Sequence, residues 1–537
     1  MNNYQEVVLE INKIISSLED KTFDHFKTKL NETSPNINIK EYDDSNLIVL
    51  SNSFTKKNST TPLLEKECKS IILDKESLEV VCYTYDDIFY NQDAKDYILQ
   101  NGLSEYSIQE CFEGTLLSFF HHNNKWNIAT RQCIDAKKSI WTSNKSYYDL
   151  FMDCIDISFD EFTNHLKPEF NYYFVLVHHD NKNIVDYTDY FGNPEYKEII
   201  HVLTRDRKTQ YDIELDNQDQ WTIYPNFKTP TRFNKDDNVQ TQNLVKFINN
   251  DDSLTVNIPE NHENFNYLDE LNKNTRLALP VKCEGLVVKV REESTNKLII
   301  MKFQTNSYQF MSILKPNNNN IYMSFLELYQ QDLLKRHLEY FPGNSKLTME
   351  GNMKESYDTI GVVDASFKVI TSELFEIFRY LYDLRDCSHK NEEFYKLLPN
   401  EYTVALYKIR GIYYRKKEKF IKSKNETEES DTTTNQYNHG LKIFDIYNML
   451  KKKYEIKDLL KLFRARKLIM ATYQNQDTSD AKIFNNLSNR CDKVSIKMIA
   501  IFLNKMFPKD PDLDVYTKVN AKSVFRKQAP AGLSVSI

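Results

Sequence analysis

Apolar residues follow two different periods in the two parts of this chain. Before about Ser324, short runs of β-branched and aromatic residues alternate with polar residues and are separated by polar turns, which is typical of β-strands. From there onward, apolar residues recur three or four positions apart, which is typical of helices with one buried face. The change of period predicts a β-rich front part and a helical rear part.

Pairs of apolar runs in the front part predict β-hairpins. Residues 70–85 (SIILDKESLEVVCYTY) read as two strands around an exposed turn, and residues 114–132 contain the clearest hairpin. Residues 171–187 repeat the pattern, with NYYFVLV and IVDY on either side of a polar turn. Residues 197–206 and 283–303 add at least three strands. We therefore expect antiparallel sheets that pack on each other.

The helical part is predicted from five amphipathic segments. Each of them spaces its apolar residues for one helix face. They are residues 325–341, 372–386, 404–421, 440–470 and 494–507. Between them, the polar segment KSKNETEESDTTTNQYNHG has almost no apolar residues, which predicts a flexible linker.

The length of 537 residues exceeds one ordinary core and predicts two or three domains. From the patterns above we expect a β-rich domain over residues 1–330 and a helical extension over residues 331–421. A flexible linker over residues 422–440 and a helical C-terminal domain over residues 441–537 complete the expected organisation.

Composition and charge exclude several classes of protein. Hydrophobic residues make up 40% and charged residues 27% of the chain, which fits neither a disordered nor a membrane protein. The formal net charge of -7 gives no overall attraction to nucleic acid, so such binding has to come from local patches. The 8 cysteines form no CxxC pair, which argues against structural zinc. With no leader pattern or membrane-spanning run, we expect a soluble protein of a reducing compartment.

Five residues of the front part suit a site for a nucleoside triphosphate. Glu113 and Gly114 open one predicted strand, and Arg131 lies on the return strand of the same hairpin. Glu284 precedes another apolar strand, and Lys302 ends the partner of that strand. A glycine lets a ligand approach the backbone, carboxylates accept ribose hydroxyls or a metal, and cations bind phosphates.

The order of these residues resembles the motifs of the covalent nucleotidyltransferase superfamily. CFEG at 111–114 occupies motif I, ATR ending at Arg131 is similar to motif Ia, YYFVLV to motif III, CEGLVVKV to motif IV and IIMKFQT to motif V. Over roughly residues 45–345 the chain is most similar to the RNA ligase group typified by the tRNA-repair ligase of T-even phages and the related proteins of giant DNA viruses.

This resemblance implies an α+β fold, in which an antiparallel-sheet nucleotidyltransferase (ATP-grasp-like ligase) domain over residues 1–330 precedes a helical C-terminal region. It also implies ATP and Mg2+ or Mn2+ as cofactors. Glu113, Gly114, Arg131, Glu284 and Lys302 are the residues that would then hold the nucleotide.

The chain departs from the ligase motifs at several positions. Motif I of these ligases is Lys-x-Asp/Glu-Gly, and its lysine attacks the α-phosphate of ATP to give lysyl-AMP. Here Cys111 stands at the nucleophile position. Val175 stands where motif III carries a glutamate, and Gln304 where motif V commonly carries a second lysine. Asp86 and Asp87 add negative charge near the expected phosphate site.

These departures predict a ligase-like protein that binds nucleotide, RNA or both without forming lysyl-AMP. Cys111 could act as a thiolate only if cations lowered its pKa, whereas the neighbouring Glu110 and Glu113 favour the neutral thiol. A buried apolar role for Cys111 is the simpler alternative. Two other functions stay open. One is an active ATP-dependent RNA ligase with an atypical nucleophile, or one that seals only pre-adenylated ends. The other is a structural virion protein that keeps the fold.

The helical part offers a candidate surface for RNA. Arg410, Arg415, Lys416 and Lys417 alternate with tyrosines, a composition that suits single-stranded nucleic acid. The run MLKKKYEIKDLLKLFRARK forms a second basic patch. Solvated helix faces with tyrosines in the core are the alternative. We predict RNA or other nucleic acid as the partner and no membrane association. The predicted compartment is cytoplasmic, the host cytoplasm or the virion if the protein is viral.

Two histidine pairs, His121-His122 and His178-His179, lie in or near polar turns. Both pairs together would supply a metal site, but turn histidines without a metal are common. We therefore predict no metal ligands.

Overall fold

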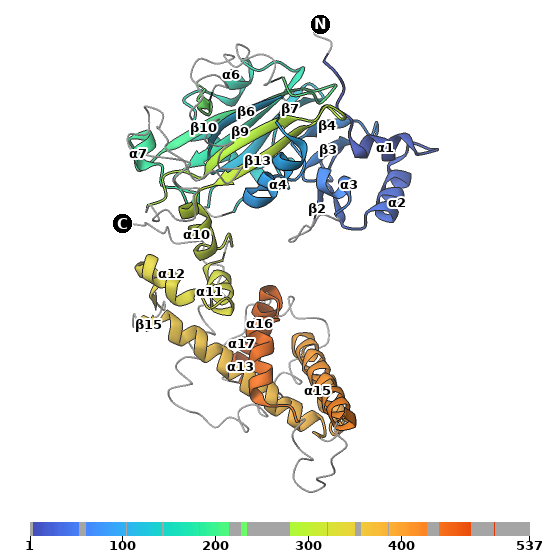
Figure 1. Cartoon of the computed structure of the whole chain (residues 1–537), viewed down its shortest axis with the longest axis vertical. Helices are drawn as coiled ribbons and strands as arrows, with labels where there is room; N and C mark the ends of the chain where they lie inside the picture. The colour runs from blue at the N-terminus through green and yellow to red at the C-terminus, as the bar shows by residue number, and fades with distance from the viewer. Residues whose placement is uncertain are drawn as a thin grey trace. The chain divides into compact units, whose positions relative to one another are not determined.

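The structure is a computed structural model that describes residues 4–52, 61–103, 105–141, 144–181, 183–213, 227–233, 280–318, 320–348, 356–384, 386–426, 440–473 and 499. The chain divides into two compact units, Met1–Ile313 and Leu314–Ile537. The first unit combines helices with mainly antiparallel sheets, in which only the described pair of β13 and β5 is parallel, and the second unit is mainly helical where it is described (Figure 1). The division falls before the boundary expected at residue 330, because helix α11 (Ile321–Gln330) packs into the core of the second unit.

Three sheets build the described part of the first unit. The first contains β1 (Ile37–Glu41), β2 (Leu47–Asn52), β3 (Ile71–Asp74) and β4 (Val80–Tyr83) in that order. The second has the order β11 (Arg232–Phe233), β6 (Tyr106–Cys111), β12 (Gly285–Arg291), β13 (Leu298–Gln304) and β5 (Phe89–Tyr90). The third has the order β10 (Lys197–Asp206), β9 (Phe170–His178), β7 (Thr115–His122) and β8 (Lys125–Thr130).

The third sheet packs against the first two. The core between them contains Val49 and Ile72 from the first sheet, Val287 from the second, and Phe120 and Tyr173 from the third. Alternate residues of several strands point into this core, such as Leu47 and Val49 of β2 and Leu298 and Ile300 of β13, as the two-residue period of the sequence predicts.

Helices cover the outer faces of the sheets (Figure 1). Helices α1 (Glu10–Ser16), α2 (Phe23–Thr33) and α3 (Leu63–Glu67) cover the first sheet, α4 (Asn91–Asn101) the second, and α5 (Tyr147–Met152) and α6 (Phe159–Thr163) the third. The short elements η1 (Ala136–Lys138) and α7 (Thr188–Phe191) lie in loops, and α10 (Asn306–Leu314) follows β13.

The hairpin predicted within residues 114–132 is confirmed. Leu117 of β7 pairs with Thr130 of β8, and His122 pairs with Lys125. The intervening residues 123 and 124 are both asparagines with φ of 50° and 58°. A two-residue turn with this backbone twist favours asparagine.

The hairpin predicted over residues 171–187 is wrong. Strand β9 forms, but it pairs with β7 and β10, and residues 184–187 form no strand. The backbone amides of Ile184 and Val185 donate instead to the Glu113 carboxylate, at 2.6 and 2.8 Å. The amides that would have donated to a neighbouring strand therefore donate to a carboxylate that is distant in sequence.

The described part of the second unit is a helical assembly. Besides α11 it contains α12 (Leu334–Tyr340), α13 (Thr359–Leu381), α14 (Glu392–Leu397), α15 (Asn400–Glu426), α16 (Ile443–Lys452) and α17 (Ile456–Tyr473), with η3 (Pro342–Asn344) and the short strands β14 (Lys346–Thr348) and β15 (Ser356–Asp358). Helix α15 extends to Glu426, so the predicted linker begins within a helix. The predicted helix at 494–507 lies outside the described residues, except for residue 499.

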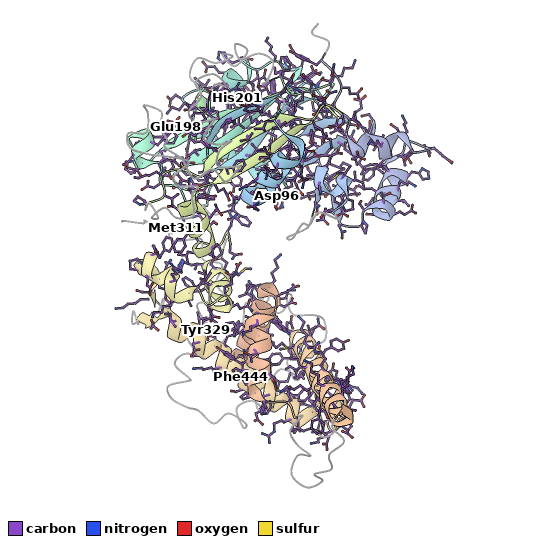
Figure 2. All side chains as sticks on the ribbon, viewed as in Figure 1. Asp96, Glu198, His201, Met311, Tyr329 and Phe444 are labelled. Atoms are coloured by element: carbon purple, nitrogen blue, oxygen red, sulfur yellow. The ribbon has the colours of Figure 1, made fainter. Side chains whose placement is uncertain are left out.

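Polar contacts tie the helices of the second unit together. The Tyr329 hydroxyl of α11 donates to Asp364 of α13 at 2.6 Å and lies 2.7 Å from the Tyr447 hydroxyl of α16 (Figure 2). Arg466 of α17 forms a buried two-pronged ion pair with Glu373 of α13, with N–O distances of 2.7 to 2.9 Å. None of the described helices combines the length and apolar content needed to cross a bilayer.

Two buried histidines of the third sheet predict that acid destabilises the first unit. Burial lowers the pKa of His178 to about 4 and that of His201 to about 3 (Figure 2), whereas the unfolded chain has a value of about 6.5. Below pH 6.5 the unfolded chain binds protons that the folded chain does not. The stabilisation of the folded state that the neutral histidines provide above that pH is therefore lost as the pH falls towards the folded-state pKa values of about 4 for His178 and about 3 for His201.

We expect the free energy of unfolding to fall by about 1.4 kcal/mol per histidine for each pH unit below about 6.5. Urea unfolding at pH 7, 6 and 5, followed by tryptophan fluorescence, measures this change, since Trp126, Trp141 and Trp221 all belong to the first unit. A His201→Asn variant should lose part of the pH dependence. Equal unfolding free energies at pH 7 and pH 5 would contradict the expectation.

Candidate functional site

Strands β6, β12 and β13 bring Cys111, Glu284 and Lys302 together. The backbone of Cys111, the last residue of β6, pairs with Gly285 of β12, and Gly285 pairs with Gln304 of β13. Glu284 immediately precedes Gly285, and Lys302 lies two residues before Gln304 on the same face of β13. Three residues taken from separate sequence motifs therefore meet at one end of one sheet.

Glu284 and Lys302 form a largely buried ion pair. The Lys302 Nζ lies 3.1 Å from both carboxylate oxygens, and Gln304 Nε2 donates to Glu284 Oε1 at 3.0 Å. Burial lowers the pKa of Lys302, but opposing charge beside it, of which the Glu284 carboxylate is the permanent source, raises it to well above its usual value. Lys302 therefore keeps its proton, and a protonated amine has no lone pair with which to attack phosphorus.

Cys111 is a buried neutral thiol. Its side chain is 3% exposed, and burial followed by the charge of Glu284 raises its pKa well above the usual value, against the opposing effect of the paired lysine. Sequence reasoning assigned this effect to Glu110 and Glu113. Strand alternation instead points Glu110 to the opposite face of the sheet, where it accepts a hydrogen bond from the Tyr190 hydroxyl at 3.1 Å. The carboxylate beside the thiol is that of Glu284.

The Glu113 carboxylate already has protein donors for both oxygens. One oxygen accepts the amides of Ile184 and Val185, and the other accepts the Tyr308 hydroxyl at 3.3 Å. The backbone amide of Glu113 donates to the Tyr187 hydroxyl at 2.6 Å. Glu113 therefore holds the 184–187 loop against the end of β6.

The two glycines that follow the acidic residues make room for backbone of the same unit. A Cβ at Gly114 would lie 2.4 Å from the Leu176 carbonyl oxygen, and a Cβ at Gly285 would lie 1.9 Å from that of Phe303. Gly285 also has a φ of 147°, which residues with a side chain rarely adopt. Close packing of strands therefore accounts for both glycines without a ligand.

Arg131 does not contact the Glu284–Lys302 ion pair among the described contacts. Strand β8 ends at Thr130, and Arg131 is exposed on the turn that follows. Within the described part of the chain, Arg131 makes no hydrogen bond or ion pair to Cys111, Glu284 or Lys302. The structure therefore joins three of the predicted site residues directly, whereas Glu113 is bonded to Tyr308 and to the 184–187 loop.

Sequence reasoning missed the roles of Asn91, Gln304 and Tyr308. The Asn91 side chain accepts the backbone amide of Gln304 at 2.8 Å and lies 3.3 Å from its side-chain oxygen, which fixes the amide that donates to Glu284. Tyr308 comes from the first turn of α10. Strand alternation from Lys302 could have placed Gln304 in the site, whereas no local pattern identifies Asn91 or Tyr308.

Asp86 and Asp87 do not present free negative charge to the site. Asp86 lies 3.1 Å from the Lys297 Nζ, which also contacts Glu67 at 2.6 Å. Asp87 pairs with Lys69 at 2.6 Å. Each aspartate therefore has a lysine beside it that partly offsets its charge, and Asp86 shares that lysine with Glu67.

The strand register separates the two histidine pairs. Strands β7 and β9 are antiparallel, so His121-His122 and His178-His179 lie near opposite ends of the pair. His178, His179 and Asp180 do cluster, but the Asp180 amide donates to His178 Nδ1 at 3.0 Å. A neutral His178 then carries its proton on Nε2, which opposes metal binding through that atom.

Helix α15 distributes its basic and aromatic residues over different faces. Tyr413 is fully buried, whereas Tyr407 is 78% and Tyr414 is 44% exposed. Arg410 lies over the Tyr414 ring, with 5.6 Å from its guanidinium carbon to the ring centroid, and Arg415 is exposed. Tyr407, Arg410, Tyr414 and Arg415 form an aromatic and basic face on the helix.

Some of the other basic residues of the helical part are bound within the unit. Lys416 pairs with Asp445 of α16 at 2.6 Å, while Lys417 is half-buried. In the second basic patch, Lys451 pairs with Asp332 and Arg466 pairs with buried Glu373. These two cations therefore contribute to packing within the unit, whereas Lys452, Lys453, Lys457 and Arg464 of the same patch are exposed.

Comparisons with known proteins give weak and partial likenesses. No protein family matches the chain. The immediate-early protein ICP-46 homolog of Invertebrate iridescent virus 3 is 31% identical over 91 residues, which are 16% of this chain and 20% of that protein. The chain therefore matches only a fifth of the length of this relative.

Solved structures of ATP-dependent ligases are similar at low scores. An archaeal ATP-dependent RNA ligase is 10% identical with a TM-score of 0.33, and the likeness covers 57% of this chain and 67% of that one. A putative ATP-dependent DNA ligase from Aquifex aeolicus is 11% identical with a TM-score of 0.33, and the likeness covers 60% of this chain and 81% of that one. A Naegleria gruberi RNA ligase variant with ATP and Mn is 13% identical, with a TM-score of 0.23 and coverage of 42% and 58%. Similarity this low leaves the function to be argued from the chain's own residues.

We expect Gly285→Ala to destabilise the first unit strongly. The new methyl group would collide with the Phe303 carbonyl and the backbone would be strained, at a cost of about 3 kcal/mol or more. Gly192→Ala is a matched control, because Gly192 also has a positive φ of 68° but no neighbouring atom within 4 Å. We expect the control to cost about 1 kcal/mol. Urea unfolding measures the free energy of unfolding of both variants. Equal losses of that free energy in the two variants would contradict the packing role of Gly285.

Proposed function

We propose that this chain is an RNA ligase-like protein that binds RNA and does not form a lysyl-AMP intermediate. The Glu284–Lys302 ion pair beside the neutral thiol of Cys111 is the observation that supports the absence of a lysyl-AMP intermediate. The ligase-type motifs I, IV and V meet there, which supports a shared origin of the arrangement, but neither candidate nucleophile is in its reactive state.

As arranged, the residues of this site fit ATP and its metal ion poorly. The carboxylates of Glu113 and Glu284 are bonded to protein donors, and the charge of Lys302 is balanced by Glu284. A phosphate could recruit Lys302 only by opening the ion pair. In this proposal ATP with Mg2+ or Mn2+ therefore binds weakly, and Glu284 and Lys302 are the residues that would hold it.

The RNA-binding part of the proposal is supported by the aromatic and basic face of α15. Exposed tyrosines provide stacking surfaces for bases, and exposed cations neutralise phosphates. Because the whole chain is acidic, such binding would come from this local face. Affinity for RNA should then fall as salt is added, since phosphate contacts release counterions.

Intact-mass measurement after incubation with ATP or GTP, and with Mg2+ or Mn2+, tests the missing adenylation. We expect no mass increase on the natural chain, because a neutral thiol and a protonated lysine are both poor nucleophiles. A Cys111→Lys variant is the control for the pocket. Its new lysine would share one carboxylate with Lys302, and a neighbouring cation lowers the pKa of an amine.

A nucleotide adduct on the natural chain would overturn the proposal. An adduct confined to the Cys111→Lys variant would show that the pocket admits the nucleotide and lacks only the nucleophile. Sealing of pre-adenylated RNA by the natural chain, absent from a Glu284→Ala variant, would favour the alternative of a ligase that performs only the last step.

A further inference from the structure

We propose that helix α15 stacks two bases of a single-stranded RNA between Tyr407 and Tyr414, in a slot that Gly411 leaves open. The inference rests on the RNA binding of the proposed function and adds the residues and the mode of recognition. It concerns the second unit alone, independently of the site at Cys111.

Gly411 has no structural reason to be a glycine. It lies inside α15, where glycine costs about 1 kcal/mol relative to alanine. Its backbone does not have a positive φ, and a Cβ there would meet nothing within 4 Å outside its own helical turns. Gly114 and Gly285 contrast with it, because backbone atoms approach both. The space beside Gly411 is open to a partner.

Two exposed tyrosines flank this open position on one helix face. Tyr407 lies four residues before Gly411 and Tyr414 three residues after it, which are the spacings of neighbours on a helix surface. Seven residues span about 10.5 Å along the helix axis. Three stacking steps of about 3.4 Å span about 10.2 Å. The axial spacing of the two positions therefore matches that of two bases stacked between the two rings.

The charges around the slot suit the phosphates of the same strand. Arg410 donates from Nη2 to the Tyr414 hydroxyl at 3.2 Å, so it positions one ring and adds positive charge beside it. Arg415 and Lys417 follow on the helix, and neither has an acidic partner among the described residues. Aromatic stacking combined with cations along a backbone is how single strands are bound without sequence preference.

Filling the slot gives the sharpest test. A Cβ at position 411 meets no described atom within 4 Å outside its own helical turns, and leucine favours the helix. The longer side chain of Gly411→Leu would then extend into the space proposed for the bases. Gly343→Leu is a matched control, because Gly343 lies in η3 of the same unit and also has no neighbour within 4 Å. Circular dichroism melting would verify that both variants fold.

Fluorescence anisotropy of the full chain with labelled 12-nucleotide oligouridylate and oligoadenylate measures the effect. We expect Gly411→Leu to weaken binding about 10- to 100-fold, the loss typical of one or two base–aromatic stacks. Tyr407→Ala and Tyr414→Ala should weaken it similarly, and Tyr407→Phe should retain it because the ring remains. Gly343→Leu should bind as the natural chain does, and a duplex RNA of the same length should be unaffected by Gly411→Leu.

The failures of the two proposals differ. Unchanged single-strand binding by Gly411→Leu, with binding by the natural chain intact, would overturn the slot and leave RNA binding standing. Equal weakening of single-stranded and duplex RNA would also overturn stacking, since it points to phosphate contacts alone. If the natural chain bound neither form, both the slot and the RNA binding would fail, whereas the absence of adenylation would be unaffected.

Discussion

The ion pair between Glu284 and Lys302 determines what the end of the second sheet can do. A carboxylate that is 4% exposed needs a cation and further donors, and Lys302 and Gln304 supply them. Removing one partner of a buried pair typically costs about 3–5 kcal/mol. A ligand that took Lys302 for its own phosphate would have to offset a cost of that kind, so the pair that stabilises the sheet also opposes nucleotide binding.

The thiol at Cys111 fits this environment, whereas a lysine would not fit it unchanged. A second ammonium group beside Lys302 would share one carboxylate and would lose its proton more readily. That is the condition under which a lysine becomes a nucleophile. With a thiol at Cys111, Lys302 has the Glu284 carboxylate to itself. In the proposed function, the absence of a reactive amine and the presence of this ion pair are two aspects of one arrangement.

The sequence revealed much of this arrangement because strand pairing follows from alternation. Glu284 and Lys302 belong to one hairpin whose strands both read clearly, so their proximity could be predicted. The role of Glu113 could not, because its hydrogen-bond partners Ile184 and Val185 come from a loop 71 and 72 residues away. The same long-range contacts made the hairpin predicted over residues 171–187 wrong, since no local pattern shows which backbone groups a distant carboxylate will bind.

The helical part shows a similar limit. Its periodicity predicted the helices, but the aromatic residues of α15 divide between core and surface according to their phase on the helix. Tyr413 is buried, and its neighbour Tyr414 is exposed. Ion pairs to other helices, such as that of Lys416 with Asp445, then decide which basic residues stay accessible. Composition alone counts all of these residues as one basic patch.

Thiol labelling resolved by peptide mass spectrometry tests the central claim most directly, because it reports the state of Cys111 itself. In the folded chain at neutral pH, we expect Cys111 to react with iodoacetamide far more slowly than the half-buried Cys154, at a rate set by unfolding. Labelling should accelerate on addition of urea. Labelling of Cys111 at neutral pH faster than that of Cys154 would mean an accessible thiolate, and it would contradict the closed, unreactive site described here.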